Sequence, residues 1–119
     1  DKVTCGEQQP ESDHFIQMEQ ASAGDDEGVH WRETRAWFSY RMNTAGKKVA
    51  RVRIAFRPDA RRDAWVYIND EKVGSLSGNG KVAQFAVPAH LQTAGSLTVK
   101  IARGDSKVTP HIYEVRLTE

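Results

Sequence analysis

The sequence lacks the features that mark several large classes of protein. It contains one cysteine, so no internal disulfide can form and cysteine usage leaves the redox compartment open. No apolar run approaches the roughly 20 residues that a membrane-spanning helix needs. The 17 Lys and Arg residues against 16 Asp and Glu give a net charge of +1, too balanced for the basic field that non-specific nucleic-acid binding requires. We therefore expect neither a membrane span nor a nucleic-acid partner.

Motifs for direct catalysis or metal binding are also absent. Cys5 lies near the start of the chain, far in sequence from any His-Asp or His-Asn pairing that would lower its pKa, so we expect an inert thiol. Carboxylate pairs for glycosidase chemistry must face each other across a cleft, which a sandwich of this size seldom builds. We assign no catalytic residue. We also expect no zinc, because no metal-ligand spacing links the four histidines, His14, His30, His90 and His111.

The length and composition indicate one domain. With 119 residues, 39% of them hydrophobic and 28% charged, the chain can build a single core. It begins at Asp1 without a basic and apolar leader, which favours an excised piece of a longer protein. The segment Gly6–His14 is polar, contains Pro10 and has no period. We therefore expect residues 1–14 to form an extended N-terminal arm or tether and residues 15–119 to form a single β-sandwich domain.

The dominant period along the chain is two, which predicts strands. Apolar residues alternate with arginine over 50–57, so one face of that strand is apolar and the other carries guanidinium groups. A solvated face of an edge or outer strand is the favoured interpretation of these arginines, ahead of a site for anionic polysaccharide. Other predicted strands cover the ranges 15–20, 37–42, 64–68, 72–76, 85–87, 97–101 and 113–117.

Turn residues separate these strands and indicate the fold class. Asn69 and Asp70 predict a hairpin between two strands, residues 77–80 form a turn cluster, and residues 89–93 predict one short helical turn. No long amphipathic helix competes. Several short strands at this spacing predict an all-β fold, an antiparallel β-sandwich or jelly roll.

Aromatic and guanidinium groups are concentrated in the stretch GVHWRETRAWFSYRM, residues 28–42. If Trp37, Ser39 and Arg41 share one face of a strand, then Phe38, Tyr40 and Met42 share the other face and belong to the core. Trp37 is then the exposed candidate, and Trp31 is expected before that strand, on a loop at one end of the sandwich. The candidate contact residues, for carbohydrate or for another domain, are Trp31, Arg32, Glu33 and Trp37.

The order of these elements resembles the galactose-binding-like jelly roll, common among carbohydrate-binding modules. The resemblance rests on an early strand ending in Glu19, a Gly-rich acidic loop, the strand Trp37–Tyr40 and the INDEKVGSL hairpin. More specifically, GEQQPESDHF and HWRETRAWFSY resemble the C-terminal β-domain of bacterial proteins of glycoside hydrolase family 127, the β-L-arabinofuranosidase-type enzymes, long described as a domain of unknown function. In that family the chemistry lies in a separate helical barrel with a zinc-bound cysteine, and none of it can be matched here.

The resemblance implies a non-catalytic accessory domain of a secreted or periplasmic bacterial glycoside hydrolase. The favoured hypothesis is a structural or docking module whose partner is the catalytic domain of the same polypeptide, because aromatic and Arg residues are common interface anchors. The alternative is a carbohydrate-binding module that recognises plant-type polysaccharide through Trp31 and Trp37, because aromatic side chains can cover the apolar face of a sugar. A third interpretation is that a Trp-Arg pair only covers an edge of the core and has a structural role.

Calcium is the one cofactor that the acidic residues suggest. Modules of the galactose-binding-like fold often hold a structural calcium near the first strand, and Glu19, Asp25 and Asp26 could supply hard oxygen ligands. Such modules commonly add an acidic or amide residue just before the closing strand, where this chain has His111-Ile112-Tyr113. We therefore favour a solvated acidic loop and expect no cofactor.

Overall fold

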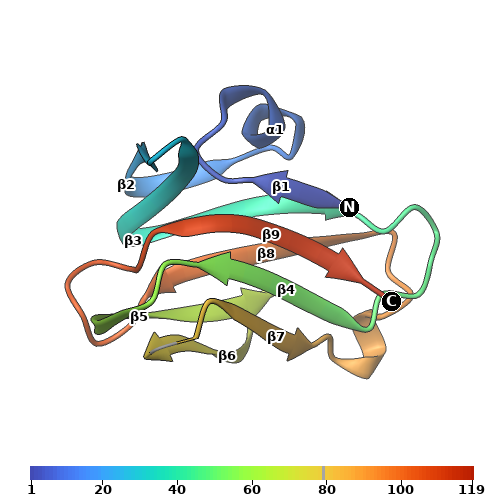
Figure 1. Ribbon diagram of the computed structural model, residues 1–119. Helices are drawn as coiled ribbons and strands as arrows, with labels where there is room; N and C mark the ends of the chain where they lie inside the picture. Colours follow the sequence, from blue (N-terminus) through green and yellow to red (C-terminus); the bar gives the residue numbers. More distant parts are fainter. Residues whose placement is uncertain (79) are drawn as a thin grey trace.

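A computed structural model of the chain describes residues 1–78 and 80–119. Within these residues it contains nine strands, one short helix and one 3-10 turn (Figure 1). In chain order they are β1 (Lys2–Thr4), α1 (Gln8–Asp13), β2 (Gln17–Asp26), β3 (Val29–Asn43), β4 (Arg51–Phe56), β5 (Asp59–Ile68), β6 (Glu71–Gly78), β7 (Val82–Ala86), η1 (Ala89–Leu91), β8 (Ser96–Arg103) and β9 (Ile112–Thr118).

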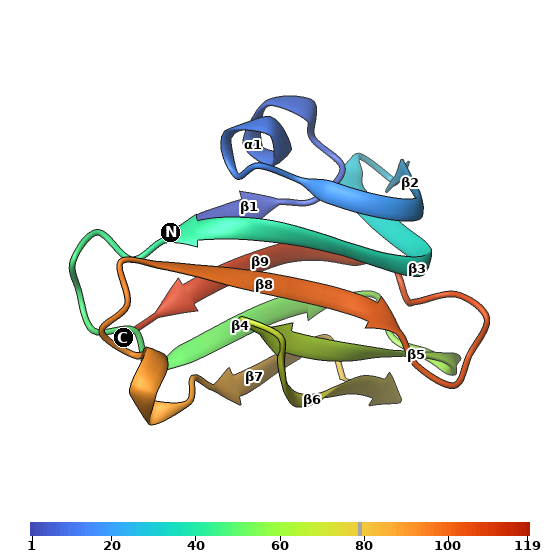
Figure 2. The ribbon, with the colours of Figure 1, turned by 180° about the vertical axis from the view of Figure 1, so that it is seen from behind.

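The strands form two packed layers, and every pairing is antiparallel. The hydrogen-bonded order is β6-β5-β8-β3-β9-β4-β7, with β2 added on β3 and β1 added on β9. The hydrogen-bonded sheet passes from one layer to the other where β3 pairs with β9, at Arg32 and Ile112. One layer is therefore β2-β3-β8-β5-β6, in front in Figure 2, and the other is β1-β9-β4-β7, in front in Figure 1. The predicted antiparallel β-sandwich is confirmed.

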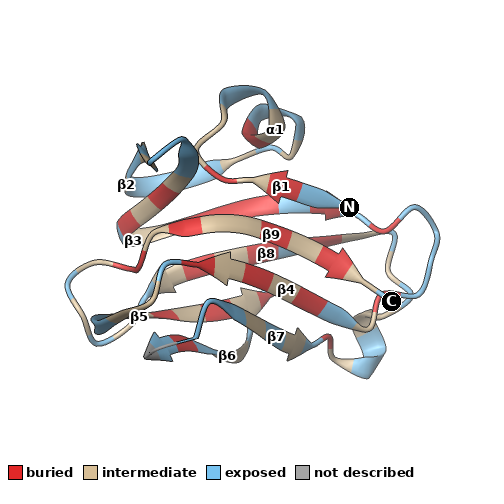
Figure 3. Cartoon of the chain, viewed as in Figure 1, coloured by how far each residue is buried: buried red, intermediate tan, exposed pale blue. Residues whose placement is uncertain are grey.

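Alternation along the strands places the core between the layers. Phe38, Tyr40 and Met42 on β3 are fully buried, as predicted. Residues 52, 54 and 56 on β4 are buried in the same alternating way, and Figure 3 shows buried positions recurring along β4 and β9. The layers also meet at β6 and β7, where the ring of Phe85 fills the space that a Cβ atom on Gly74 would need, 2.5 Å away. The sandwich is therefore nearly closed.

Turn chemistry accounts for the predicted hairpin between β5 and β6. Asn69 and Asp70 both have positive φ, 47° and 68°, which is the conformation of the type I′ turns that join twisted strands. The short helical turn expected after β7 is present as η1. The turn expected at residues 77–80 includes Asn79, which lies outside the described residues.

The first 14 residues differ from the tether expected from the sequence. Residues 2–4 pair with β9 as strand β1, and the side chains of Val3 and Cys5 are fully buried. Residues 8–13 form helix α1, which lies over the edge of the sandwich beside β1 and β2 (Figures 1 and 2). The prediction of an extended tether was wrong because the few apolar side chains of this segment show no period, although two of them enter the core.

Two further expectations are corrected by the strand register. The acidic loop expected after the first long strand is part of β2, which continues to Asp26 and turns at Gly28 directly into β3. Trp31 therefore lies within a strand and not on a loop. The arginine-bearing strand β4 is flanked by β7 and β9, so it is not an edge strand, although Arg51 on its outer side is exposed. None of the described helices is long and apolar enough to cross a membrane.

Candidate functional site

The layer β2-β3-β8-β5-β6 lies in front in Figure 2, and we call its solvent side the outer face. The strand register places a row of five residues across it. Ala102 on β8 is the cross-strand neighbour of Trp65 on β5 and of Trp37 on β3. Ser75 on β6 and Glu19 on β2 continue the row at its two ends. We call these five residues the tryptophan row. The two tryptophans lie two strand spacings apart, about 9.5 Å, with a small side chain between them.

Neighbouring polar groups hold the aromatic rings of the outer face. The indole Nε1 of Trp37 donates a hydrogen bond of 3.1 Å to the carboxylate of Glu19. The ammonium group of Lys72 lies 3.9 Å from the ring centroid of Trp65. The ammonium of Lys100 lies 4.8 Å from the ring of Tyr67, the next outward residue on β5. Both tryptophans are half-buried, so part of each residue stays open to solvent.

This arrangement has the two components that sugars require. A sugar ring has an apolar C–H face, which stacks on an aromatic side chain, and a rim of hydroxyl groups, which need fixed donors and acceptors. The tryptophan row supplies two indole rings, and Glu19, Lys72 and Ser75 beside them supply the polar groups. The outer face can therefore bind an extended, hydroxyl-rich ligand.

Trp31 lies at the other end of β3, against a polar network at the β2-β3 turn. Its ring stacks on His111, with centroids 3.8 Å apart and planes inclined by 13°. A Cβ on Gly24 would lie 2.5 Å from the ring, so β2 also packs against the indole. The indole Nε1 is buried and makes no hydrogen bond within the described residues. These contacts give Trp31 a structural role at this end of the sandwich.

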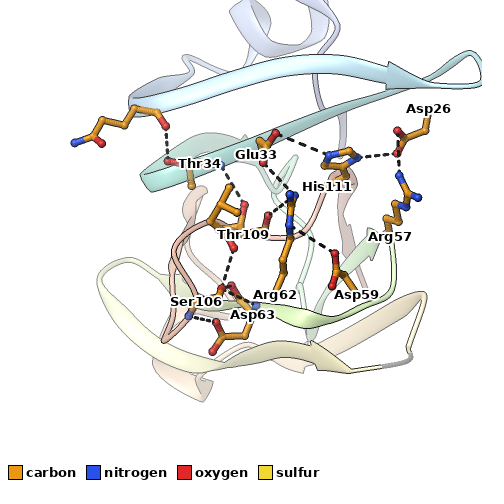
Figure 4. A network of polar contacts seen from close by, with 12 residues as sticks. Asp26, Glu33, Thr34, Arg57, Asp59, Arg62, Asp63, Ser106, Thr109 and His111 are labelled. Atoms are coloured by element: carbon orange, nitrogen blue, oxygen red, sulfur yellow. Dashed lines mark hydrogen bonds and ion pairs between the residues drawn. The ribbon is translucent and has the colours of Figure 1, made fainter.

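Asp26 belongs to this polar network, and Figure 4 shows its contacts with His111 and Arg57. Its Oδ2 lies 2.8 Å from Nδ1 of His111 and accepts a hydrogen bond of 2.8 Å from the hydroxyl of Tyr113. The guanidinium of Arg57 lies 3.5 Å from Oδ1. Burial alone would raise the pKa of Asp26, but the hydrogen bonds from His111 and Tyr113 outweigh it and lower the pKa. Burial, together with the bond to Asp26, raises the pKa of Tyr113 to about 12.

Glu33 belongs to the same network and is not a free contact residue. Its carboxylate pairs with Arg62 at 3.1 Å, and the other oxygen lies 3.9 Å from Nε2 of His111. Arg62 also faces Asp59 at 3.6 Å (Figure 4). A small cleft of about 250 Å³ opens here, lined by Arg57, Asp59, Arg62 and His111. Every charged group in it has an opposite charge beside it, so the network fastens β3, β5 and β9 together and leaves little unpaired charge for a ligand.

Arg32 differs most from its expected place on the surface. It is 8% exposed and binds Glu11 of α1 through two hydrogen bonds, Nε to Oε2 at 2.7 Å and Nη2 to Oε1 at 2.8 Å. The hydroxyl of Tyr40 donates a third bond, of 2.6 Å, to the same carboxylate. Burial would raise the pKa of Glu11, but the bonds from Arg32 and Tyr40 lower it overall. Arg32 therefore anchors α1 to the core and is buried instead of lying on the surface.

The three carboxylates considered as calcium ligands each have a different partner. Glu19 accepts the indole hydrogen bond of Trp37, and Asp25 accepts one from the backbone N–H of Gly28. Asp26 is held by His111, Tyr113 and Arg57, as described. These three residues contact the carboxylate oxygens of Asp26 that a cation would need as ligands. Among residues 1–78 and 80–119, no group of three or more His, Cys, Asp or Glu could hold a metal ion. The residues present do not fit a calcium site.

The sequence pattern predicted Trp37 as a contact residue but did not predict its counterpart, Trp65. The signal was present, because Trp65 and Tyr67 alternate with the apolar residues 64, 66 and 68 and so face outward on a predicted strand. What the sequence could not supply was the register of β8, which brings Ala102 between the two tryptophans. Trp37 was expected to be exposed and is half-buried, because its ring is drawn toward Glu19.

Solved structures share this fold at low sequence identity. A family 35 carbohydrate-binding module from Clostridium thermocellum has a TM-score of 0.65 and 12% identity, covering 100% of this chain and 98% of that one. A family 36 module in complex with calcium and xylotriose has a TM-score of 0.67 and 15% identity, covering 99% of both chains. An exo-β-1,3-galactanase from Phanerochaete chrysosporium, in a structure with galactose, has a TM-score of 0.65 and 11% identity, covering 99% of this chain and 29% of that one.

These likenesses show that the chain shares the jelly-roll fold of these domains. Comparison with curated proteins finds no match. The model of one protein family, described as a family of unknown function, DUF6805, matches residues 1–118. The match extends over both layers and over the segment that forms β1 and α1. The chain therefore belongs to the family of unknown function DUF6805.

Proposed function

We propose that this domain is a carbohydrate-binding module that holds a polysaccharide on its outer face. One observation carries the proposal: Trp37 and Trp65 flank Ala102 in a single register row, so one sheet surface presents two tryptophans two strands apart. The similar solved structures include carbohydrate-binding modules of families 35 and 36, which supports this ligand class. The proposal assigns no catalytic residue.

The physical basis is the stacking of sugar rings on the two tryptophans. Aromatic side chains bury a large apolar area at little cost in conformational entropy, and indole rings are frequent binding hot spots. The hydrogen bond from Trp37 to Glu19 fixes one ring before any ligand arrives. Of the candidates from the sequence, Trp37 is kept as a ligand contact, whereas Trp31, Arg32 and Glu33 are assigned to the framework that supports the sheet.

The wider setting of the domain is also part of the proposal. In the galactanase, and in a GH26-CBM35 β-(1,4)-mannanase from Podospora anserina, the matched region covers 29% and 28% of a longer chain. These longer chains support an accessory domain within a larger protein. We propose that this protein is a bacterial, secreted glycoside hydrolase that acts on plant-type polysaccharide. The family 127 parent expected from the sequence belongs to this proposal as well, with the catalytic domain of the same polypeptide as partner.

Affinity gel electrophoresis and titration calorimetry with xylan, β-1,3-galactan and mannan test the binding function. We expect saturable binding to at least one polymer, and a loss of affinity of about tenfold or more for Trp37→Ala and for Trp65→Ala. Val82→Ala, an exposed apolar residue on the other layer, is the matched control and should bind as the wild type does. Circular dichroism checks that each variant is folded. Binding that is unchanged in both tryptophan variants, or no binding by the wild type, would refute the proposal.

Docking onto a catalytic domain is a second candidate function, favoured by two exposed apolar side chains. Met18 on β2 is 44% exposed and Val29 on β3 is 50% exposed, both on the β2-β3 hairpin. The two candidates predict different outcomes. If the hairpin docks, Met18→Ser and Val29→Ser should lower the melting temperature of the full-length protein without changing polysaccharide affinity. If it does not, Val29→Ser should leave the melting temperature of the full-length protein unchanged. Met18→Ser should lower it only as far as it lowers that of the 119-residue domain, because Met18 Sδ also accepts a hydrogen bond of 3.4 Å from Arg32.

A further inference from the structure

Phe15 has an unusual backbone conformation at the end of α1. Its φ is 53°, in the left-handed region, and its side chain is 66% exposed. The N–H of Phe15 donates to the carbonyl of Ser12, and the N–H of Ile16 donates to the carbonyl of Glu11, which closes the last turn of the helix. Glycine is the usual residue at this position after a helix because it has no Cβ to clash. A phenylalanine here therefore costs stability, and its ring recovers little of that cost by burial.

The surrounding contacts hold this conformation in place. His14, the preceding residue, has Nδ1 2.7 Å from the carbonyl of Pro10 and Nε2 2.9 Å from the carboxylate of Asp1. That carboxylate also accepts a hydrogen bond of 2.9 Å from the backbone N–H of Asn43 on β3. The carbonyl of His14 accepts a bond of 2.8 Å from the N–H of Arg41. Strain that several contacts enforce, in an exposed bulky residue, is a feature of ligand-binding positions.

A groove of about 910 Å³ lies directly beside Phe15. The residues that line it include Asp13, Phe15, Arg41, Asn43 and Ser96. The guanidinium carbon of Arg41 lies 6.0 Å from the ring centroid of Phe15. An aromatic ring with a guanidinium, an amide, a hydroxyl and a carboxylate around it repeats the chemistry of the tryptophan row. The volume falls within the range typical of small-ligand sites.

The groove continues the outer face along β3. Trp37, Arg41 and Asn43 occupy odd positions of one strand, so their side chains leave the sheet on the same side. Arg41 and Asn43 pair with Thr98 and Ser96 of β8, the strand that also carries Ala102. Four residues of antiparallel strand separate Trp37 from Arg41, a distance of about 14 Å. A polysaccharide lying along β3 can therefore reach both places, whereas a single sugar cannot.

We infer that the Phe15 groove is a second contact site for the same saccharide chain, so that the domain recognises an internal run of several sugar units and not a chain end. This inference rests on the proposed carbohydrate-binding function. Phe15 is the stacking residue of the second site, and Arg41 and Asn43 provide its polar contacts. The affinity should consequently rise with the length of the oligosaccharide until both sites are filled.

Phe15→Gly separates a ligand contact from a structural role. Glycine suits the left-handed backbone, so we expect this variant to fold and to melt at a higher temperature than the wild type. Calorimetry uses disaccharides to hexasaccharides of xylan, β-1,3-galactan and mannan. The wild type should bind the longer members of one series more tightly than the shorter ones. Phe15→Gly should lose about tenfold in affinity for the hexasaccharide and keep wild-type affinity for the disaccharide.

The outcomes distinguish this inference from the proposed function. If Phe15→Gly melts at a higher temperature and keeps the wild-type dependence on length, the second contact site is wrong while binding at the tryptophan row stands. If the wild type binds saccharides of every length equally well, the inference fails in the same way. If the wild type binds none of these oligosaccharides or their parent polymers, both proposals fail.

Discussion

Glu11 and Arg32, which are 21 residues apart in the chain, form a two-point ion pair in the core beneath α1. Their side chains are 5% and 10% exposed, so both charges have been removed from water. The hydroxyl of Tyr40 completes the carboxylate's set of donors. A buried pair of this kind depends on each partner, because removing one leaves the other as an uncompensated charge. The position of α1, and with it the position of Phe15, depends on this contact.

Glu11→Ala should destabilise the domain strongly. We expect the free energy of unfolding to fall by about 3–5 kcal/mol, because Arg32 would remain buried without a partner. Denaturant unfolding followed by tryptophan fluorescence measures the change. Gln9→Ala, on the exposed side of the same helix, is the control and should change stability by less than about 0.5 kcal/mol. A loss below about 1 kcal/mol for Glu11→Ala would show that the ion pair is not what holds α1.

The depressed pKa of Glu11 predicts acid sensitivity with a defined sign. Because the folded pKa lies below the unfolded value, the stability from this group is complete above about pH 4.3. It is lost as the pH falls from there through the folded pKa. Unfolding curves recorded between neutral and acidic pH should show this loss in the wild type. Glu11→Gln cannot titrate, so its stability should fall less steeply in the same window, and parallel curves for both proteins would contradict the assignment.

Gly24→Ala tests the contact between β2 and Trp31. A Cβ at this position would meet the indole ring at 2.5 Å, and the ring is trapped because it stacks on His111. We expect a loss of about 1–3 kcal/mol in the free energy of unfolding, as for other overpacked sites. Gly95→Ala is the matched control, since nothing lies within 4 Å of its added Cβ. If the two variants unfold at the same denaturant concentration, β2 does not pack on Trp31 in solution.

Tyr113 should report on the carboxylate of Asp26. Burial and the hydrogen bond to Asp26 raise the pKa of Tyr113 to about 12, so replacing the negative charge should bring it down. We expect alkaline ultraviolet titration of Asp26→Asn to show one tyrosine that ionises at lower pH than in the wild type. Tyr113→Phe identifies the signal, because the late transition should disappear in that variant. An unchanged titration of Asp26→Asn would place the cause of the shift elsewhere.

Cys5 should be chemically silent in the folded protein. Its thiol is fully buried, and burial raises its pKa to about 12, so almost no thiolate exists at neutral pH. A maleimide reagent should label Cys5 only after unfolding, at a rate that follows the unfolded fraction. Ser77→Cys introduces an exposed thiol as the positive control and should add one rapidly labelled site. Rapid labelling of Cys5 in the native wild type would mean that β1 opens readily.

Local patterns in the sequence predicted the sheet, because period-two alternation depends on neighbouring residues. Phe38 and Met42 were assigned to the core for this reason, and both are buried. Contacts between distant residues were beyond such reasoning. The role of Arg32 depends on its ion pair with Glu11, which lies in a segment with no period. The place of Trp65 in the tryptophan row depends on the register between β5 and β8. The left-handed conformation of Phe15 could not be foreseen either, because a bulky side chain normally argues against it.

The position of β9 has a consequence for how the domain is made. This strand follows every other strand in the chain, yet it lies between β4 on one side and β1 and β3 on the other. During synthesis, β1 therefore has no strand to pair with until residues 112–118 have left the ribosome. Until then the layer β1-β9-β4-β7 also lacks the strand that joins β1 to β4. We expect the strands of the nascent chain to stay only partly paired, with their apolar faces exposed to water, until β9 is available. The domain should then fold in one late step dominated by long-range contacts.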